Sequence, residues 1–165
     1  MRSDVALRPL DEELLQELLD AAVADADPLE VMPPVAGPPG WTPERRSAFL
    51  RFHRSRALAA EPVESTYAIV VEDTVVGAAR LCPMEERTGA AEAGVWIGRS
   101  HRGGGVGGAA LRRLLALARA DGIDAVFVST TPDNTAVHRL LTALGVDLVR
   151  TEDAVTAWVN PAAAG

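Results

Sequence analysis

The 165-residue sequence contains no lysine, and all 16 of its basic residues are arginines. Without lysine the chain can form neither a Schiff base nor the nucleoside-triphosphate loop that ends in Gly-Lys-Ser/Thr. It has one cysteine, Cys82, which excludes an internal disulfide and a multi-cysteine zinc site. Tyrosine is equally scarce, because Tyr67 is the only one.

Long apolar runs are missing as well. No stretch approaches the ~20 apolar residues that cross a bilayer, and the first four residues, Met-Arg-Ser-Asp, lack the apolar core of a signal peptide. We therefore expect a cytoplasmic protein without a membrane partner. Hydrophobic residues make up 48% of the chain and charged residues 24%, which is typical of a globular domain.

The net charge of −7 argues against a nucleic-acid partner, because such binding needs a basic surface. An acidic protein suits a cationic partner such as an amine, although acidity is also a plain route to solubility. His53, His101 and His138 show no metal-ligand spacing, so we expect no metal site.

Hydrophobic periodicity predicts a single domain over residues 1–160, followed by a frayed tail over 161–165. Apolar residues at helical spacing predict four helices, over 11–24, 43–58, 104–120 and 133–144. β-Branched and apolar runs predict seven strands, over 5–8, 66–72, 75–82, 92–98, 125–130, 146–149 and 154–159. The order β-α-α-β-β-β-α-β-α-β-β indicates a mixed α/β domain.

Local signals predict where these elements begin and end. Asp11 and Asp133 are expected to cap the N-termini of their helices, and Asp73-Thr74 is expected to form the turn of a hairpin. Residues 26–43 form a proline-rich connection. Its prolines oppose regular helix, so we expect extended or turn geometry there.

The most informative segment is residues 103–108, of which five are glycine, between a predicted strand and a predicted helix. Glycine lets backbone N–H groups approach a ligand, and a helix N-terminus concentrates unpaired donors, so the segment predicts a phosphate site with Arg102 at its mouth. A flexible linker is the alternative. A dinucleotide fingerprint, Gly103-x-Gly105-x-x-Gly108, also fits. However, the acidic residue of that fingerprint stands at the end of the second strand, whereas Asp124 would stand at the beginning of a strand.

Arg102-Gly103-Gly104-Gly105-Val106-Gly107 fits R/Q-x-x-G-x-G/A, the pyrophosphate loop of the GNAT N-acetyltransferase superfamily. The similarity extends over residues 92–97, Asn134 and residues 140–146, so the chain resembles that family. The resemblance implies an α+β fold with a single mixed, mostly antiparallel, twisted sheet flanked by about four helices. It also implies acetyl-CoA as acyl-donor cosubstrate and no metal.

By the same resemblance, the pyrophosphate of CoA rests on loop amides and the pantetheine arm pairs with the fourth strand, while Asn134 contacts the arm. The implied cofactor residues are Trp96, Ile97, Gly98, Arg102, Gly103, Gly104, Gly105, Val106, Gly107, Gly108 and Asn134. Bonds along the strand would be main-chain bonds, so substitutions of Val95 or Ile97 should act through packing.

Attack on a thioester needs a neutral amine, so a nearby group must accept its proton. Glu92 is our candidate general base, because members of the family place a glutamate near the start of this strand. The alternative is that Glu92 is a surface residue at a strand end. Glu85 and Glu86, in the adjoining turn, are weaker candidates.

The chain departs from the family where a tyrosine usually protonates the leaving thiolate, because Leu141 occupies that position. His138 lies one helical turn earlier and could replace the tyrosine as acid, although a histidine on a helix surface is more often a bystander. A thiol with a pKa near 8.5 also leaves fairly well without an acid.

The resemblance places the acceptor pocket under residues 26–60. His53 could shape it together with Trp41, Phe49 and Phe52, although packing explains the aromatics equally well. We expect acetylation of a primary amine on a small molecule: an amino-sugar antibiotic, a polyamine or an amino-acid derivative. The alternatives are a protein lysine or N-terminal acetyltransferase and a non-catalytic CoA-binding sensor. A homodimer is also open, because family members often dimerise through a late strand.

Overall fold

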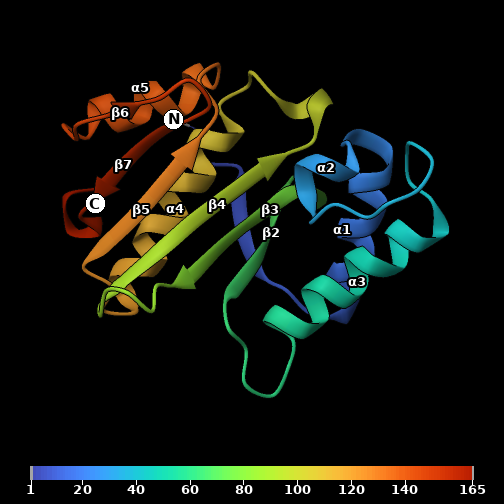
Figure 1. The fold of residues 1–165 in the computed structure, drawn as a ribbon. Coiled ribbons are helices and arrows are strands. Elements are labelled where there is room, and N and C mark those ends of the chain that lie inside the picture. Colours follow the sequence, from blue (N-terminus) through green and yellow to red (C-terminus); the bar gives the residue numbers. More distant parts are fainter. Residues whose placement is uncertain (1, 165) are drawn as a thin grey trace.

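The computed structural model describes residues 2–164 and contains one seven-stranded sheet in the order β1-β2-β3-β4-β5-β7-β6 (Figure 1). Among these residues the β4–β5 pair is parallel and the other neighbouring pairs are antiparallel. The predicted fold class is therefore confirmed. The strands are β1 Val5–Pro9, β2 Ser65–Val71, β3 Thr74–Pro83, β4 Ala90–Ile97, β5 Ala125–Thr130, β6 Val149–Arg150 and β7 Val155–Val159.

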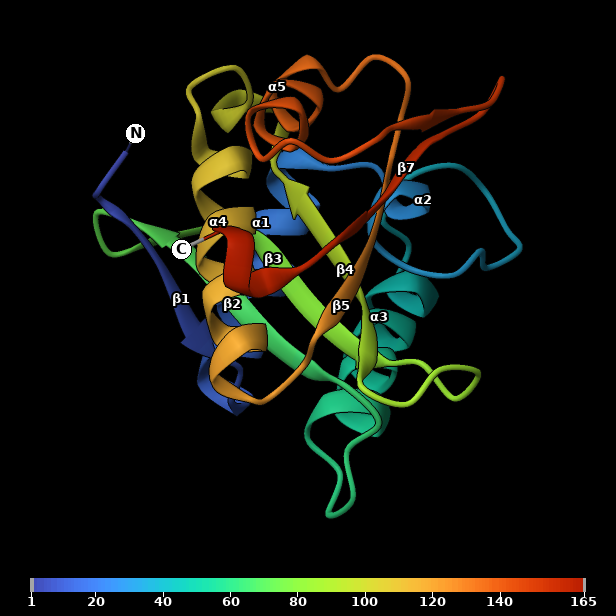
Figure 2. The ribbon, with the colours of Figure 1, turned by 90° about the vertical axis from the view of Figure 1, so that its left-hand side faces the viewer.

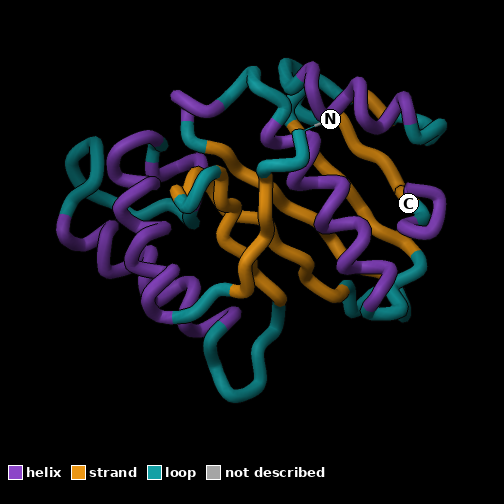
Figure 3. Tube along the Cα trace, turned by 180° about the vertical axis from the view of Figure 1, so that it is seen from behind, coloured by secondary structure: helices purple, strands orange, loops and turns teal. Residues whose placement is uncertain are grey.

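Helices lie on both sides of the sheet, as the view from behind shows (Figure 3). Figure 2 shows α4 on one side of the strands and α2 and α3 on the other. None of the described helices is long and apolar enough to cross a membrane. The helices are α1 Glu12–Asp25, α2 Pro28–Val31, α3 Pro43–Ala57, α4 Val106–Ala120 and α5 Thr135–Ala143, with 3-10 turns at Arg99–His101 and Pro161–Ala164.

Each face of the sheet carries its own hydrophobic core, because successive strand residues point to opposite faces. Ile69 packs with α4 and α5, whereas its neighbours Ala68 and Val70 pack with α1 and α3. Helices α1 to α3 cover only the half of their face that lies near β2 and β3. The corresponding face of β4 and β5 has no helix over it and is turned to the viewer in Figure 1.

The proline-rich connection differs from the prediction, because Pro28–Val31 form one turn of helix. Pro28 stands at the start of this turn, where the missing N–H is not needed, so proline is compatible with helix there. Asp27 and Glu30 complete a capping box around it.

Several predicted boundaries shift by a few residues. The hairpin turns at Glu72 and Asp73, both with positive φ, instead of at Asp73-Thr74. The N-cap of α5 is Asn134 and not Asp133. The sixth strand is only Val149–Arg150, since residues 146–148 are a loop, and Pro161–Ala164 form a turn packed against α4 where the sequence predicts a frayed tail.

Candidate active site

The central feature of the site is an opening between β4 and β5. The two strands pair from Ala90↔Ala125 to Ala93↔Val128, and then separate while β4 continues beside β3 to Ile97 (Figure 1). The N–H of Gly98 donates to the carbonyl of Val76 at 2.9 Å. Because antiparallel bonding alternates, the even-numbered residues of β4 bond to β3, and Val95 and Ile97 present their backbone groups to the opening.

The main-chain donors at the opening are therefore Val95 and Ile97. Of the three strand residues predicted for the cofactor, Ile97 faces the opening, whereas the backbones of Trp96 and Gly98 are turned to β3. The carbonyl of Ile97 accepts a bond from Arg102 Nε at 2.9 Å. The sequence alone does not predict the contact at Val95, because the strand register decides which residues of β4 bond to β3 and which face the opening.

The glycine loop joins this opening to the start of α4. Gly105 is the N-cap of α4 with φ +83°, a left-handed conformation that L side chains rarely adopt. The next three amides, in residues 106–108, precede the first donor of the helical ladder, which is Ala109 bonding to Gly105. A Cβ at Gly98 would overlap the carboxylate of Asp25, which also binds the N–H and hydroxyl of Ser100. The amides of residues 106–108 are therefore available to a ligand, and the bonds of Asp25 to Ser100 hold the preceding backbone in place. A phosphate site needs such unpaired N–H donors.

Arg102, predicted at the mouth of the loop, forms an ion pair with Glu30 of α2. Its Nη2 lies 2.8 Å from Glu30 Oε2, and Arg99 Nη2 lies 2.8 Å from the other oxygen. The Arg102 bond, with help from the backbone N–H of Asp27 and from Arg99, lowers the pKa of Glu30 to about 2. These two ion pairs connect the segment before the glycine loop to α2.

An open hollow with a volume of about 440 Å³ lies over the first turn of α4. Arg2 and Arg112 line it beside Gly105 and Gly108, and Arg2 also bonds to the carbonyl of Gly104. These two cations are candidates for further phosphate contacts. Sequence reasoning missed them, because neither lies in the glycine motif.

A cavity of about 340 Å³ lies on the face of the sheet opposite α4 (Figure 2), between β4 and helices α2 and α3. This size is ordinary for a small-molecule site. Most of its wall is apolar, with three ionisable side chains: Glu30, His53 and Arg80. The lining residues are Leu29, Glu30, Val31, Met32, Pro33, Phe52, His53, Thr66, Ala78, Ala79, Arg80, Gly94, Val95 and Trp96.

Of the four residues predicted to shape the pocket, His53 and Phe52 line this cavity, whereas Trp41 and Phe49 do not. His53 is 3% exposed, and neither of its ring nitrogens has a hydrogen-bond partner among the described residues. Burial lowers its pKa to about 4, so the ring is neutral at pH 7. Phe49 is fully buried behind His53 with ring centroids 4.6 Å apart, and Trp41 stacks edge-on against Phe49.

Behind the cavity wall, two arginines share one buried carboxylate. Glu64 accepts from Arg80 at 2.7 Å and from Arg56 at 3.3 Å, and its side chain has no exposed surface. The two arginine side chains keep about a third of their surface exposed, 37% for Arg80 and 34% for Arg56. This cluster carries one net positive charge.

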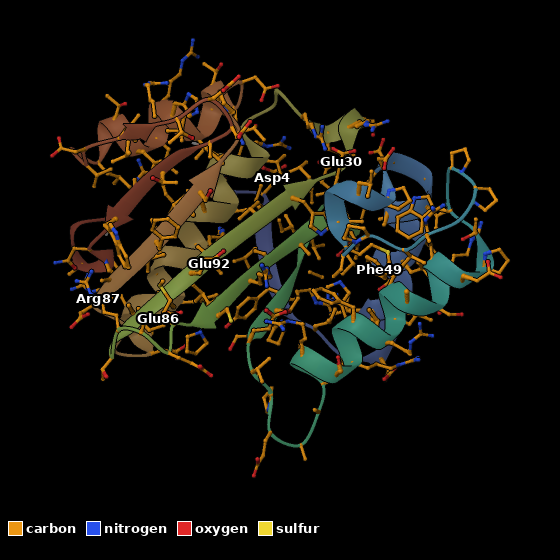
Figure 4. The ribbon with its side chains drawn as sticks, viewed as in Figure 1. Asp4, Glu30, Phe49, Glu86, Arg87 and Glu92 are labelled. Atoms are coloured by element: carbon orange, nitrogen blue, oxygen red, sulfur yellow. The ribbon has the colours of Figure 1, made fainter. Side chains whose placement is uncertain are left out.

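Glu92 lies on β4 one residue before its pairing with β5 ends. Ala91 and Ala93 are buried toward α4, so Glu92 projects to the helix-free face, where it is exposed (Figure 4). Glu85 and Glu86 lie in the turn before β4, at the opposite end of the strand from the opening, as Figure 4 shows for Glu86. Glu92 is therefore the predicted carboxylate nearest the site.

The predicted acid, His138, lies on α5 with Nε2 3.1 Å from the carbonyl of Thr131. That nitrogen must carry the proton to make the bond. Leu141, at the position of the missing tyrosine, is fully buried in the core beneath α5. Tyr67 packs on the α4 face of β2, so it does not replace the tyrosine.

Asn134, predicted to contact the pantetheine arm, caps α5 instead of pointing freely to solvent. Its Oδ1 accepts from the N–H of Val137 at 3.3 Å and its Nδ2 donates to Thr130 at 2.9 Å. Thr130 ends β5, so Asn134 fixes α5 to the strand that forms one side of the opening. Within residues 2–164 no cluster of metal-ligating side chains could hold a metal ion.

Comparison with solved structures shows the same fold in N-acetyltransferases. Mutant forms of the spermidine/spermine N-acetyltransferase SpeG from Vibrio cholerae match with a TM-score of 0.69 and 14% identity, over 98% of this chain and 96% of that one. An N-acetyltransferase from Staphylococcus aureus Mu50 has a TM-score of 0.64 and 17% identity, over 96% and 99%. The GNAT domain of S. lividans PAT has a TM-score of 0.67 and 18% identity, over 94% and 90%.

No curated relative matches the sequence. The profile of the family described as "Acetyltransferase (GNAT) domain" matches residues 4–147, which is most of the chain. Its match spans the opening between β4 and β5, the glycine loop and the capped start of α5. The chain therefore belongs to the GNAT family and is an acetyl-CoA-dependent N-acetyltransferase.

Proposed function

We propose that this enzyme acetylates the primary amine of a small molecule: an amino sugar, a polyamine or an amino-acid derivative. The observation that carries the proposal is that the open edge of β4 is reached from two sides. The glycine loop and α4 lie at one end of it, and the cavity of about 340 Å³ includes Gly94 to Trp96. A donor and an acceptor can therefore meet at the same strand.

The residues of the donor side fit acetyl-CoA, which supplies an acetyl group activated as a thioester. The amides of residues 106–108 and the guanidinium of Arg102 would hold the pyrophosphate, with Arg2 and Arg112 near enough to hold another phosphate. The backbone of Val95 and Ile97 would bind the arm. A free N–H on this edge can also donate to the reacting carbonyl oxygen as it gains negative charge.

We assign the general-base role to Glu92. The acceptor arrives as an ammonium, and its proton must be removed before the nitrogen can attack. Glu92 is exposed on the face from which an acceptor would approach, so it could take the proton directly or through water. For the leaving thiolate we propose that solvent supplies the proton, because His138 donates to Thr131 and Leu141 is buried.

The volume of the cavity, about 340 Å³, supports a small acceptor over a protein acceptor. The description of SpeG, a spermidine/spermine N-acetyltransferase, is consistent with a small amine here at the level of the fold. The alternative of a non-catalytic CoA sensor rests on the missing tyrosine alone, because Leu141 occupies that position. We also propose a homodimer formed through the β6 edge, where Val149 is 60% exposed, to be checked by light scattering.

The test is release of free thiol from acetyl-CoA with a panel of amines: aminoglycosides, polyamines, amino acids and lysine peptides. We expect release with one class of small amine. Release with lysine peptides alone would contradict the small-molecule assignment. Tight CoA binding without release on any amine would favour the sensor.

A further inference from the structure

The acceptor cavity has a local charge opposite to that of the whole chain. The protein carries a net charge of −7, but the two acids in and behind the cavity wall are both neutralised by arginines. Glu64 is shared by Arg56 and Arg80, and Glu30 is shared by Arg99 and Arg102. The cluster of Arg56, Glu64 and Arg80 keeps one net positive charge at the cavity wall without counting Arg102, and this charge disfavours a polycationic acceptor.

Arg80 lines the cavity directly across from Gly94 of β4. A Cβ on Gly94 would lie 3.1 Å from Arg80 Nε and 3.3 Å from its Cγ. Gly94 is the first residue of β4 beyond the paired segment. The absence of a side chain at Gly94, which lies directly across from Arg80 on the neighbouring strand, therefore makes room for the arginine in the cavity wall.

His53 provides a second polar group that lacks a partner. Its ring lies among Phe49 and Phe52, lines the cavity, and leaves both nitrogens without a hydrogen bond within the described residues. The rest of the wall is apolar, from residues such as Leu29, Met32 and Phe52.

We propose, building on the proposed function, that the acceptor is an apolar α-amino acid whose carboxylate binds Arg80 and whose side chain fills the cavity beside His53. Arginine binds a carboxylate with two parallel hydrogen bonds, and the Arg80 side chain remains 37% exposed beside Glu64. Arg80 and residues 94–96 of β4 line the same cavity, so a carboxylate bound to Arg80 would direct an adjacent amine toward β4, as in an α-amino acid.

The experiment compares three matched acceptors: an apolar amino acid, its amide and its decarboxylated amine. Phenylalanine, phenylalaninamide and phenethylamine form one set, and leucine and methionine give two more. The full chain is assayed by thiol release from acetyl-CoA. We expect kcat/KM for at least one free amino acid to exceed that of its amide and amine by more than about tenfold.

Variants identify Arg80 as the cause. Arg80→Gln should raise KM for the amino acid about 10- to 100-fold and leave the decarboxylated amine within about threefold. Arg51→Gln, an exposed arginine of α3 outside the cavity, is the matched control and should change neither. If Arg80→Gln does not fold, the double variant Glu64→Gln/Arg80→Gln is used in its place, because it removes both charges of the pair.

Two results would overturn the inference while leaving the enzyme intact: equal rates with amino acid, amide and amine, or an equal loss on all three in Arg80→Gln. Failure of every amine in the wider panel, with acetyl-CoA still bound, would instead contradict the proposed function itself.

Discussion

Burial keeps His53 neutral, and the free energy of unfolding should reflect this. Its pKa is lowered to about 4 in the folded chain, against about 6.5 when unfolded. Between these values the unfolded chain binds a proton that the folded chain does not, so stability is complete above pH 6.5 and falls as the pH falls toward 4. From pH 7 to pH 5 we expect His53 to account for a loss of about 2 kcal/mol, measured by urea unfolding.

The control for this prediction is a pair of substitutions. His53→Phe should remove that part of the pH dependence, because phenylalanine does not titrate and suits the neighbouring rings of Phe49 and Phe52. His101→Phe changes an exposed histidine and should leave the slope unchanged. A slope that persists in His53→Phe would mean that other groups cause it.

Glu92 is the residue on which the proposed chemistry depends most. Glu92→Gln keeps the shape of the side chain but cannot accept a proton, so we expect kcat to fall by about 100-fold or more. CoA affinity, measured by calorimetry, should be unchanged because the side chain lies away from the glycine loop.

Glu86→Gln is the matched control, since Glu86 is exposed in the turn at the far end of β4. It should retain full activity. Unchanged turnover in Glu92→Gln would show that the amine loses its proton to another group or to water, and Glu92 would then be only a strand-end residue.

Among single residues, the glycine loop can be recognised in the sequence, whereas the charged residues around the acceptor cavity cannot. The glycine loop and Arg102 are contiguous, so a pattern can show them. The cluster of Arg56, Glu64 and Arg80 cannot be found in this way, because its members come from α3, the segment before β2, and β3. Only the register of the strands brings Arg80 opposite Gly94.

Among the elements, α5 depends on a single cap. Asn134→Ala removes the Oδ1 bond to the Val137 N–H and the Nδ2 bond to Thr130, so we expect a loss of about 1 kcal/mol in unfolding free energy. Denaturant titration measures this loss. Asn134→Ser retains a capping oxygen and should recover most of it.

CoA affinity in these two variants separates a cap from a ligand contact. If Asn134 acts only through α5, affinity should recover in Asn134→Ser along with stability. If Asn134→Ser regains stability but not affinity, the amide itself binds the cofactor. Equal stability of Asn134→Ala and the natural chain would contradict the capping role.

The order and type of the main elements could be predicted because their apolar periods are clear, whereas their ends depend on rival signals. Asp133 and Asn134 are both good caps, and the hydrogen bond to Thr130 favours the second. Proline was taken to oppose helix in residues 26–43, yet Pro28 begins α2 because its position is the first of the turn. A tail docked on α4 depends on contacts distant in sequence, which periodicity does not contain.

For the molecule as a whole, Glu30 holds the donor side and the acceptor side together. It lines the cavity and binds Arg102, to which the proposed function assigns the pyrophosphate. Glu30→Gln should release Arg102 and tighten CoA binding by about two- to tenfold, a modest effect because these ion pairs are partly exposed. Calorimetry at low salt measures it, since salt weakens such pairs.

Glu44→Gln, an exposed acid of α3 outside the cavity, controls for the change in net charge. It should alter CoA binding much less than Glu30→Gln does. Weaker binding in Glu30→Gln would show that the ion pair preorganises Arg102 and does not compete with the pyrophosphate.

The double engagement of Glu30 makes the two substrates thermodynamically coupled. When a phosphate draws Arg102 away, the carboxylate at the edge of the cavity loses one of its two counter-charges and α2 loses a tether to the loop. Whatever factor the cofactor then applies to acceptor affinity, the acceptor must apply to cofactor affinity in equal measure. Double-reciprocal plots of initial rates should therefore intersect above or below the abscissa, because the apparent affinity for each substrate depends on the concentration of the other.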